Sequence, residues 1–547
     1  MALSCTSRRL HATSLAATVL LSSTACASVD ARDASGDGPV ASSAGGAGSP
    51  RGSILPSDAG RDATTSPATS DAADTARLAD AGDAGEARAP APPVPFAEWR
   101  HREPIYELYV RHFSPEGDFR GVEDRLPELA ALGVGILWLL PVHEIGSLTP
   151  VNGGEGIDFP HGNPYAVKDY EHPNPEYGRE RTRASAERDL ESLVRSAHDL
   201  GMHVILDWVP NHTAWDNRLV TEHPDWYVHE NGRIKPVGDE FRWIAQLDWS
   251  NADLRAWMTD EMARWVRRYD LDGFRVDFAH AMPLEPFETL RTKVGPGKSL
   301  FLLAEAGDRR FHPTFDMTYD WTVYPVFGDV ASGLSPTTRI DDALLHGQLV
   351  PFASEPEAIV MRMTYNHDDN GTFTLQDRYR GGQKAFAVVA SLLPGKPLLF
   401  DGQEVGMNVF DGTTVRPSAP LGHDPAVKID WNDPDGFRPF YTKLLRLFRA
   451  NRALHQPGMA DFRKLDTLPA SPVYAFVRRA ADEVVVVVAN LSGRDLGEVV
   501  LAPAPNVGSL AGDFVELFDG TAHSLAAGTS VRLPPWGYRV FVRGPRA

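Results

Sequence analysis

Between Phe96 and about residue 459, short apolar runs alternate with longer amphipathic segments, which limits the folds that the chain can adopt. Eight of these runs predict buried strands, at 105–110, 135–140, 203–206, 273–276, 300–304, 315–318, 359–364 and 397–400. Helical periodicity falls between most of them, as at 183–200, 252–269 and 384–393. Eight such units in roughly 350 residues predict an α/β fold, a (β/α)8 barrel of the TIM type.

Two further segments complete the predicted architecture. Segment 213–246, after the third strand, is too long for an ordinary βα loop and too short for an independent domain. From about residue 460 onward, strand-like runs replace the helical pattern, at 473–477, 483–489, 498–501, 514–517 and 538–542. We therefore expect a barrel over 96–459, with a short insertion after strand 3, and a C-terminal antiparallel β-sandwich domain over 460–547.

The first 95 residues have the composition of an export signal followed by a linker. Arg8 and Arg9 precede an apolar run at 12–21, and small residues lead into Cys26. This pattern resembles a bacterial lipoprotein signal over 1–26, with ordinary signal cleavage as the alternative. Ala, Gly, Ser, Asp and Pro dominate 27–95 and predict a disordered tether. We expect an exported bacterial protein, extracellular or attached to the cell envelope by a lipid anchor at Cys26.

Charge and cysteine content exclude several classes of protein. The formal net charge of −19 argues against a nucleic-acid partner, which would require clustered Lys and Arg. The two cysteines, Cys5 and Cys26, both precede the predicted barrel, so no disulfide framework is expected there. No run of about 18 apolar residues predicts a membrane-spanning helix. The lipid anchor is thus the expected membrane attachment, and the oligomeric state is left open.

Acidic residues follow four of the predicted barrel strands. These acids are Asp207, Asp277, Glu305 and Asp368. Barrel enzymes place their catalytic groups at the C-terminal ends of the strands, so we expect the four acids to converge there. A single acid in such a place is commonly a helix cap, but four together are harder to explain in that way.

Converging carboxyl groups suit glycoside cleavage. One carboxyl must donate a proton to the leaving oxygen while another stays ionised to attack or stabilise an oxocarbenium-like centre. Arg275 lies two residues before Asp277, on the same side of the predicted strand, and is expected to keep Asp277 ionised. An inward salt bridge that only fills the barrel is the alternative role for Arg275.

Six segments, in order, resemble the signature regions of the α-amylase family of glycoside hydrolases. They are Asp-Trp-Val-Pro-Asn-His at 207–212, Gly-Phe-Arg-Val-Asp at 273–277, Ala-Glu-Ala at 304–306, Tyr-Asn-His-Asp at 365–368, and the longer segments 163–170 and 394–404. By matching position, the resemblance implies that Asp277 is the nucleophile, Glu305 the general acid and base, and Asp368 a stabiliser of the transition state. It also implies retention of the anomeric configuration.

The same resemblance implies the residues that contact the substrate. His212 and His367 are expected to hydrogen-bond sugar hydroxyls, with core packing as the alternative for each. Tyr165 is expected to stack on the sugar ring, and Arg275 to contribute to the same site. Asp207 is expected to support the site by orienting Arg275 or His212.

Two departures from the family pattern limit this transfer. Phe-Ala-His-Ala follows Asp277, where many members carry Lys-His at the last two places, so a leaving-group contact by His280 is not carried over. Asn211 supports the site and lies, with Asp248, where calcium-binding members place ligands, yet the short insertion supplies few further oxygens. We expect no cofactor for the chemistry and no catalytic metal, and leave a structural calcium ion open.

Three functions agree with these observations. The leading hypothesis is hydrolysis of α-1,4-glucosidic bonds in starch-like glucans or maltooligosaccharides through a covalent glycosyl-enzyme intermediate. A neopullulanase- or cyclomaltodextrinase-like hydrolase, or a glucanotransferase, would use the same residues. A non-catalytic glucan-binding protein would be expected to lack one or more of the three carboxyl groups, and all three are present.

Overall fold

A computed structural model describes residues 95–546, apart from 158, 160, 347–356, 370–373, 408–427, 458–461 and 503–509. The predicted export signal at 1–26, including Cys26, lies outside the described residues, as does the predicted linker up to residue 94. The predicted boundary between 459 and 460 also falls in a segment that is not described.

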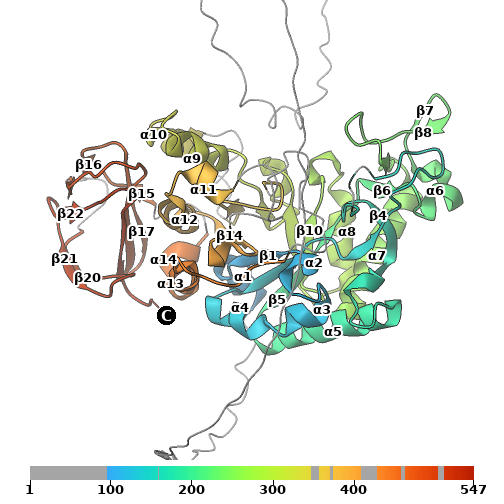
Figure 1. Cartoon of the computed structure of the whole chain (residues 1–547), viewed down its shortest axis with the longest axis horizontal. Helices are drawn as coiled ribbons and strands as arrows, with labels where there is room; N and C mark the ends of the chain where they lie inside the picture. The colour runs from blue at the N-terminus through green and yellow to red at the C-terminus, as the bar shows by residue number, and fades with distance from the viewer. Residues whose placement is uncertain are drawn as a thin grey trace, which may run out of the picture. The chain divides into compact units, whose positions relative to one another are not determined.

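Eight parallel strands close into a barrel, in which each strand pairs with its two neighbours (Figure 1). They are β1 Ile105–Leu108, β2 Ile136–Leu139, β5 His203–Trp208, β10 Gly273–Val276, β11 Phe301–Ala304, β12 Met317–Thr318, β13 Ile359–Arg362 and β14 Lys396–Phe400. Nearly every residue of these strands is buried, because helices cover the outside of the barrel and side chains fill its interior. The predicted (β/α)8 barrel is confirmed, although β12 is only half as long as expected.

Helices follow or precede the barrel strands. Their bounds are α1 Phe96–Arg102, α2 Val110–Phe113, α3 Phe119–Glu123, α4 Leu126–Leu132, α5 Arg183–Asp199, α6 Leu219–Glu222, α7 Ala252–Tyr269, α8 Glu285–Val294, α9 Val323–Ala331, α10 Thr338–His346, α11 Leu375–Tyr379, α12 Gln383–Leu392, α13 Phe437–Ala450 and α14 Arg452–His455. In helix α7, identifiable residues explain where the helix begins and ends. The Asn251 side chain accepts hydrogen bonds from the first free backbone N–H groups, and Asp270 ends the helix in a left-handed conformation.

Two excursions leave the barrel at the C-terminal ends of its strands. After β5, β6 His212–Ala214 pairs with β9 Ile244–Gln246 and closes the insertion, which also holds the hairpin of β7 His229–Glu230 and β8 Arg233–Ile234. After β2, β3 His143–Ile145 pairs with β4 Val167–Pro173, a hairpin that the sequence did not predict. This second excursion carries Tyr165 toward the strand ends.

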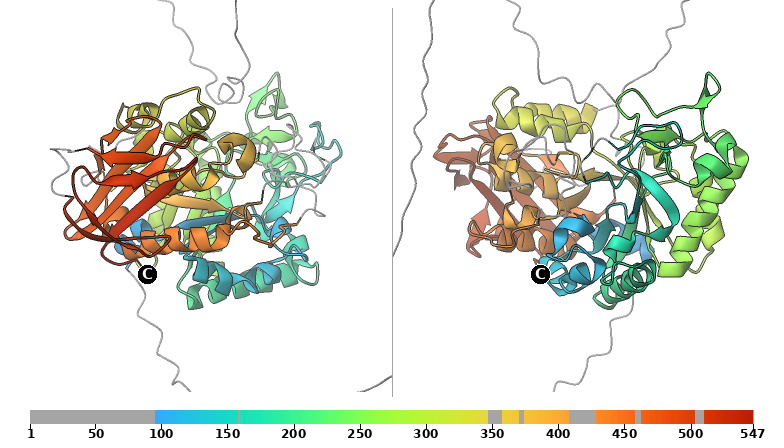
Figure 2. Two further views of the ribbon diagram at one scale, coloured as in Figure 1. Left: turned by 60° about the vertical axis from the view of Figure 1, so that its left-hand side comes forward. Right: turned by 45° about the vertical axis from the view of Figure 1, so that its right-hand side comes forward.

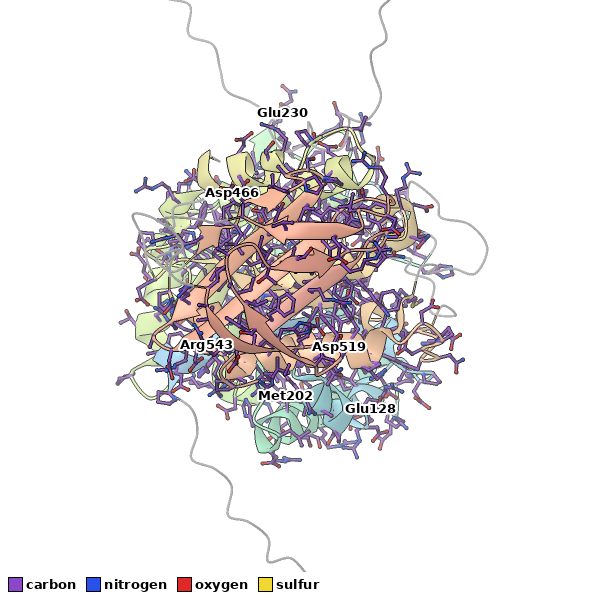
Figure 3. All side chains as sticks on the ribbon, turned by 90° about the vertical axis from the view of Figure 1, so that its left-hand side faces the viewer. Glu128, Met202, Glu230, Asp466, Asp519 and Arg543 are labelled. Atoms are coloured by element: carbon purple, nitrogen blue, oxygen red, sulfur yellow. The ribbon has the colours of Figure 1, made fainter. Side chains whose placement is uncertain are left out.

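The C-terminal segment forms two antiparallel sheets, with strand orders β15-β17-β18-β23-β20-β21 and β16-β19-β22. The bounds are β15 Arg463–Lys464, β16 Thr467–Leu468, β17 Val473–Ala480, β18 Glu483–Asn490, β19 Glu498–Leu501, β20 Gly512–Glu516, β21 Ala522–Leu525, β22 Ser530–Arg532 and β23 Tyr538–Arg543. The sheets enclose an apolar core of their own, so the predicted β-sandwich is confirmed. These strands come forward in the left view of Figure 2 and face the viewer in Figure 3, with Asp466 above and Asp519 below.

The sandwich packs on the barrel through helices near the end of the barrel segment. Helix α12 contacts β18, and α14 contacts both β17 and β18. Within the described part of the chain, no helix is long and apolar enough to cross a membrane.

Candidate active site

Three of the four predicted acids lie on neighbouring strands. Asp207 belongs to β5, Asp277 directly follows β10, and Glu305 directly follows β11. The strand ladder continues past the strand ends, because Asp277 N donates to Trp208 O at 2.9 Å and Glu305 N donates to Val276 O at 3.0 Å. Adjacent strands therefore hold these side chains at the same end of the barrel.

Arg275 joins the three acids. One of its terminal nitrogens, Nη1, lies 2.8 Å from Asp207 Oδ1 and 2.9 Å from Asp277 Oδ1. The other, Nη2, lies 3.0 Å from Glu305 Oε2. The arginine side chain is only 1% exposed, so one buried guanidinium balances three carboxyl groups.

The protonation of Asp277 depends on the charge of Glu305. Burial raises the pKa of Asp277 well above its ordinary value, and the charge of Glu305 raises it further, while Arg275 lowers it. Arg275 forms the predicted ion pair, but burial outweighs it. A proton on Glu305 removes one cause of the high pKa and so favours ionised Asp277, which is the combination that glycoside cleavage needs. The oxygen Asp277 Oδ2 is buried and has no hydrogen-bond partner among the described residues.

Glu305 is oriented by its neighbours through one oxygen. Besides Arg275, the backbone N–H of Phe278 donates to Glu305 Oε2 at 2.7 Å. Both contacts fall on Oε2, so Oε1 is the oxygen available to carry the transferable proton. The Phe278 backbone has φ 50° and ψ 30°, a left-handed conformation that is unusual for a bulky residue. We infer that backbone strain at Phe278 is the cost of aiming its N–H at Glu305.

If the backbone of Phe278 is strained, a Gly variant at this position should be more stable than an Ala variant, which is the reverse of the order expected within a helix. Phe278→Gly is expected to be more stable than Phe278→Ala by about 1 kcal/mol, because glycine adopts positive φ without a Cβ clash. Phe287, buried in α8, is a matched control, since there the Gly variant should be the less stable of the pair. Urea unfolding of the four variants measures both differences. The same order at both positions would contradict the strain.

Asp368 and His367 lie in the loop after β13 and face the same end of the barrel. The ring nitrogen His367 Nε2 lies 3.2 Å from Asp368 Oδ1, and Asn366 Nδ2 donates to Asp368 Oδ2 at 3.1 Å. The Asp368 side chain is 50% exposed. Burial lowers the pKa of His367, but the carboxylates of Asp368 and Glu107 outweigh this effect and raise it to about 9. His367 is thus a cation at neutral pH.

Tyr165 contacts both Asp207, which pairs with Arg275, and His367, which pairs with Asp368. Its hydroxyl donates to Asp207 Oδ2 at 2.9 Å and lies 2.9 Å from His367 Nε2. Its ring stacks on the ring of His367, with the centroids 5.5 Å apart. The structure therefore places Tyr165 beside Asp207 and His367, where its hydroxyl is already bonded.

Both ring nitrogens of His212 lie near other protein groups. Its Nε2 lies 3.1 Å from the Tyr165 carbonyl oxygen, and its Nδ1 lies 3.2 Å from Asn211 Nδ2. The ring is buried, which lowers its pKa to about 4, so the imidazole is neutral. Both ring nitrogens have protein partners, and a sugar hydroxyl would have to displace one of them. Asp207 contacts Arg275 and Tyr165, so of its two expected targets it holds the arginine.

Two residues of the site were not predicted from the sequence. Glu107 on β1 is fully buried and forms an ion pair with His367 Nδ1. Tyr319, directly after β12, accepts a hydrogen bond from Arg275 Nε at 3.2 Å. The available signal for Glu107 was a lone acid in the apolar run 105–110.

The two residues considered for calcium have partners of their own. Asn211 Nδ2 lies against the ring of His212, and Asp248 Oδ1 accepts hydrogen bonds from Ser250 N at 3.0 Å and from Ser250 Oγ at 2.7 Å. Neither arrangement forms the cage of six to eight oxygens that calcium requires. The question of a structural calcium ion, left open from the sequence, therefore stays open.

Another group of possible cation ligands lies on β4. Atoms of Asp169, Glu171 and His172 lie within 4.8 Å of one another, the sole such group of acids and histidines among the described residues. Arg183 already pairs with Asp169 at 3.1 Å, and Arg218 with Glu171 at 2.7 Å. Protein cations thus satisfy these acids.

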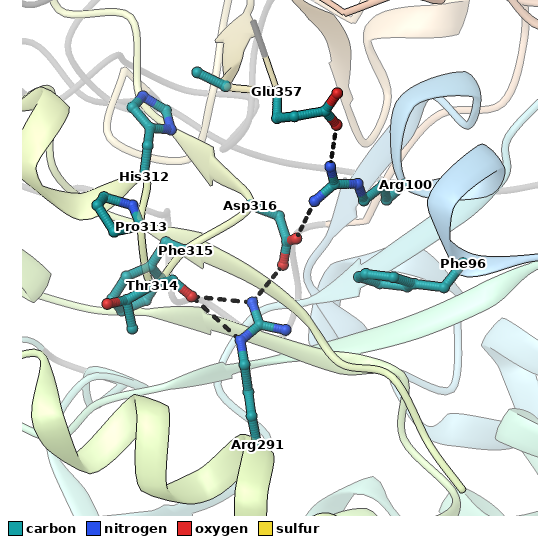
Figure 4. A pocket seen from close by; sticks show the side chains of 10 residues that line it. Phe96, Arg100, Arg291, His312, Pro313, Thr314, Phe315, Asp316 and Glu357 are labelled. Atoms are coloured by element: carbon teal, nitrogen blue, oxygen red, sulfur yellow. Dashed lines mark hydrogen bonds and ion pairs between the residues drawn. The ribbon is translucent and has the colours of Figure 1, made fainter. Parts of the chain in front are cut away.

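A pocket of about 480 Å³ lies away from the catalytic acids (Figure 4). It is lined by residues that precede β12 and β13, and so lies at the opposite end of the barrel. Asp316 there lies between Arg100 at 3.1 Å and Arg291 at 2.7 Å, and Arg100 also pairs with Glu357. These charges are mutually paired, which fits the stabilising role usual for this end of a barrel.

Comparison with known proteins gives consistent matches. The family model described as "Alpha amylase, catalytic domain" matches residues 67–294, a range that includes Asp277 and ends before Glu305. Alpha-amylase MalA of Haloarcula japonica is 31% identical over 325 residues, which cover 56% of this chain and 45% of that protein. A cyclomaltodextrinase of Geobacillus thermopakistaniensis is 22% identical, covering 78% of this chain and 70% of its own.

Solved structures share the fold. The crystal structure of the maltogenic α-amylase AmyB of Thermotoga neapolitana superposes with a TM-score of 0.67 at 23% identity. The match covers 81% of this chain and 99% of that one. The match therefore spans nearly the whole of a solved structure of this fold, but less than half of the Haloarcula protein.

Proposed function

We propose that this chain is a glycoside hydrolase of the α-amylase family and that it hydrolyses α-1,4-glucosidic bonds in starch-like glucans or maltooligosaccharides. The observation that carries the proposal is the buried Arg275, which holds Asp277 and Glu305 at neighbouring strand ends within 3.0 Å of one guanidinium. Asp368, in the loop after β13 at the same end of the barrel, is paired with His367.

The family resemblance suggests a step for each carboxyl group, and the contacts of the site are compatible with it. Asp277 Oδ2 attacks the anomeric carbon while Glu305 Oε1 gives its proton to the leaving glycosidic oxygen, so that a glycosyl ester of Asp277 forms. Glu305 then takes a proton from water, and the resulting hydroxide displaces Asp277 from the anomeric carbon. Two displacements at one carbon give net retention.

Asp368 and His367 suit the charge that develops between these steps. The sugar ring gains positive charge in the oxocarbenium-like transition state, and the exposed carboxylate of Asp368 can stabilise that charge. The protonated His367 holds Asp368 from one side, and Asn366 holds it from the other. A fixed carboxylate costs little reorganisation when the charge appears.

A second candidate function keeps the mechanism and changes the substrate. The relatives include a cyclomaltodextrinase and a maltogenic α-amylase, which favours a hydrolase acting on cyclic or short maltooligosaccharides. The two candidates differ in which glucans reach Asp277, and a glucanotransferase differs in whether water or a sugar displaces it.

A time course of products from starch, pullulan, cyclodextrin and maltotriose tests these proposals. Random shortening of starch is expected for the leading candidate, whereas faster opening of cyclodextrin or panose from pullulan would favour the second. Products longer than maltotriose would indicate transfer. Proton NMR of the first products should show the α-anomer, as retention requires. Initial formation of the β-anomer would contradict the assignment of Asp277 as nucleophile.

A further inference from the structure

Glu107 is a fully buried acid in the middle of the barrel wall. It lies on β1, between Tyr106 and Leu108, and none of its surface is exposed. Its Oε1 pairs with His367 Nδ1, and its Oε2 is buried without a hydrogen-bond partner among the described residues. Burying a carboxylate is costly, so a barrel that only needed filling would be more stable with an apolar side chain here.

The hydrogen bonds around His367 fix its protonation. The single hydroxyl proton of Tyr165 is donated to Asp207 Oδ2 at 2.9 Å, so this hydroxyl can only accept from His367 Nε2, which lies 2.9 Å away. The carboxylates of Asp368 and Glu107 likewise accept from Nε2 and Nδ1. With Glu107, Asp368 and Asp207 ionised, each ring nitrogen of His367 has an acceptor for a proton, which is the arrangement that suits an imidazolium.

We propose that Glu107 is a positioning residue for the glycosidase reaction, whose carboxylate keeps His367 doubly protonated and thereby fixes Tyr165 and Asp368. This inference rests on the proposed function. Glu107 itself lies on the far side of His367 from Asp368 and acts on substrate through that ring.

The charges that face His367 from every side agree with this role. The acids Glu107 on β1, Asp368 on its own loop and Asp207 on β5 face it, as does the cation Arg275 on β10. Burial raises the pKa of Glu107 and of Asp207, and the charge of His367 lowers both. Arg275 is already shared by Asp207, Asp277 and Glu305. A second cation is thus needed in the same buried space, and Glu107 supplies the charge that stabilises it there.

The variant Glu107→Gln tests the proposal. Glutamine keeps the shape and an acceptor for Nδ1–H but removes the charge. Ring-labelled ¹⁵N-histidine NMR, with the His367 signal identified by its loss in His367→Asn, should show both ring protons in the wild type up to about pH 9. In Glu107→Gln, His367 should lose its second proton at least about one pH unit lower. At neutral pH kcat is expected to fall about tenfold to a hundredfold, with KM nearly unchanged.

Glu404→Gln is the matched control. Glu404 is also fully buried, pairs with Tyr106 at 2.7 Å instead of His367, and likewise has an Oε2 without a partner among the described residues. Its replacement should leave both kcat and the titration of His367 near the wild-type values. Equal loss of activity in the two Gln variants would overturn the proposal and assign Glu107 a purely structural role.

Three further outcomes bear on the proposal, and the first and third need only the wild type. If Glu107→Gln does not fold, a wild-type His367 that carries one proton at pH 7 overturns the proposal by itself. In the His367→Asn background, Glu107→Gln should add no further loss of kcat, and an additional loss would overturn it. A wild type that cleaves no α-glucan but shows the predicted titration refutes the proposed function and leaves the imidazolium in place.

Discussion

The Asp277→Asn variant is expected to lose about 10⁴- to 10⁶-fold in kcat on any α-glucan that the wild type cleaves. The amide cannot form the glycosyl ester through which the reaction passes. The oxygen that would attack, Asp277 Oδ2, is buried and has no hydrogen-bond partner among the described residues. Release of reducing ends from starch measures the loss. Binding of a maltooligosaccharide should survive, since the variant keeps the shape of the site.

The same variant should be more stable than the wild type, by a margin that grows with pH. Burial raises the pKa of Asp277, so the folded protein binds a proton there more tightly than the unfolded chain does. That contribution is complete below the ordinary aspartate pKa of about 4 and is lost as the pH rises through the raised value. Asparagine has no such loss. Thermal melts from pH 4 to pH 8 should therefore diverge, by on the order of 1 kcal/mol or more.

Asp401→Asn separates these effects from the general removal of a buried acid. Asp401, after β14, is 1% exposed, its pKa is raised by burial, and its Oδ2 accepts a hydrogen bond from the Tyr109 backbone at 2.9 Å. Its replacement should leave activity near the wild-type level. An Asp277→Asn protein that keeps more than about a hundredth of wild-type kcat would rule out Asp277 as the nucleophile.

The parts of the fold that were predictable are those in which burial fixes the sequence. A parallel strand covered on both faces requires an apolar run, and runs such as the one that forms β11 at Phe301–Ala304 were visible for that reason. The hairpin of β3 and β4 was missed because both strands are partly exposed and polar. Strands β15 and β16, with two residues each, are too short to show a periodicity.

Some residues of the candidate site were also predictable from the sequence, and others were not. Asp277 and Glu305 were predictable because each directly follows an apolar strand. The contact between Tyr165 and His367 joins residues 202 positions apart, which a single sequence cannot reveal. Glu107 lies inside a strand, where an acid resembles a surface residue until the closed barrel shows that it faces inward. The left-handed backbone of Phe278 carries no sequence signal either, since the residue there is not glycine.

Arg275→Met is expected to lower the free energy of unfolding by about 3–5 kcal/mol and to abolish activity. Methionine keeps much of the aliphatic stem but leaves Asp207, Asp277 and Glu305 without the buried cation that they share. Urea unfolding gives the stability, and activity is measured at a temperature where the variant is folded. Arg362→Met is a matched control, because Arg362 on β13 is equally buried but pairs with Asp320. It should be destabilised while the folded fraction stays active.

A second substitution shows whether the loss comes from uncompensated charge. Asp207 is fully buried and lies 2.8 Å from Arg275, so removal of the arginine leaves its carboxylate with the Tyr165 hydroxyl as its one remaining side-chain partner among the described residues. Asp207→Asn should therefore destabilise the wild type but restore at least about 1 kcal/mol in the Arg275→Met background. Activity should stay absent in the double variant, because Asp277 and Glu305 still lack their shared cation. Strictly additive losses would mean that Arg275 stabilises the barrel by packing, and that the three acids tolerate burial without it.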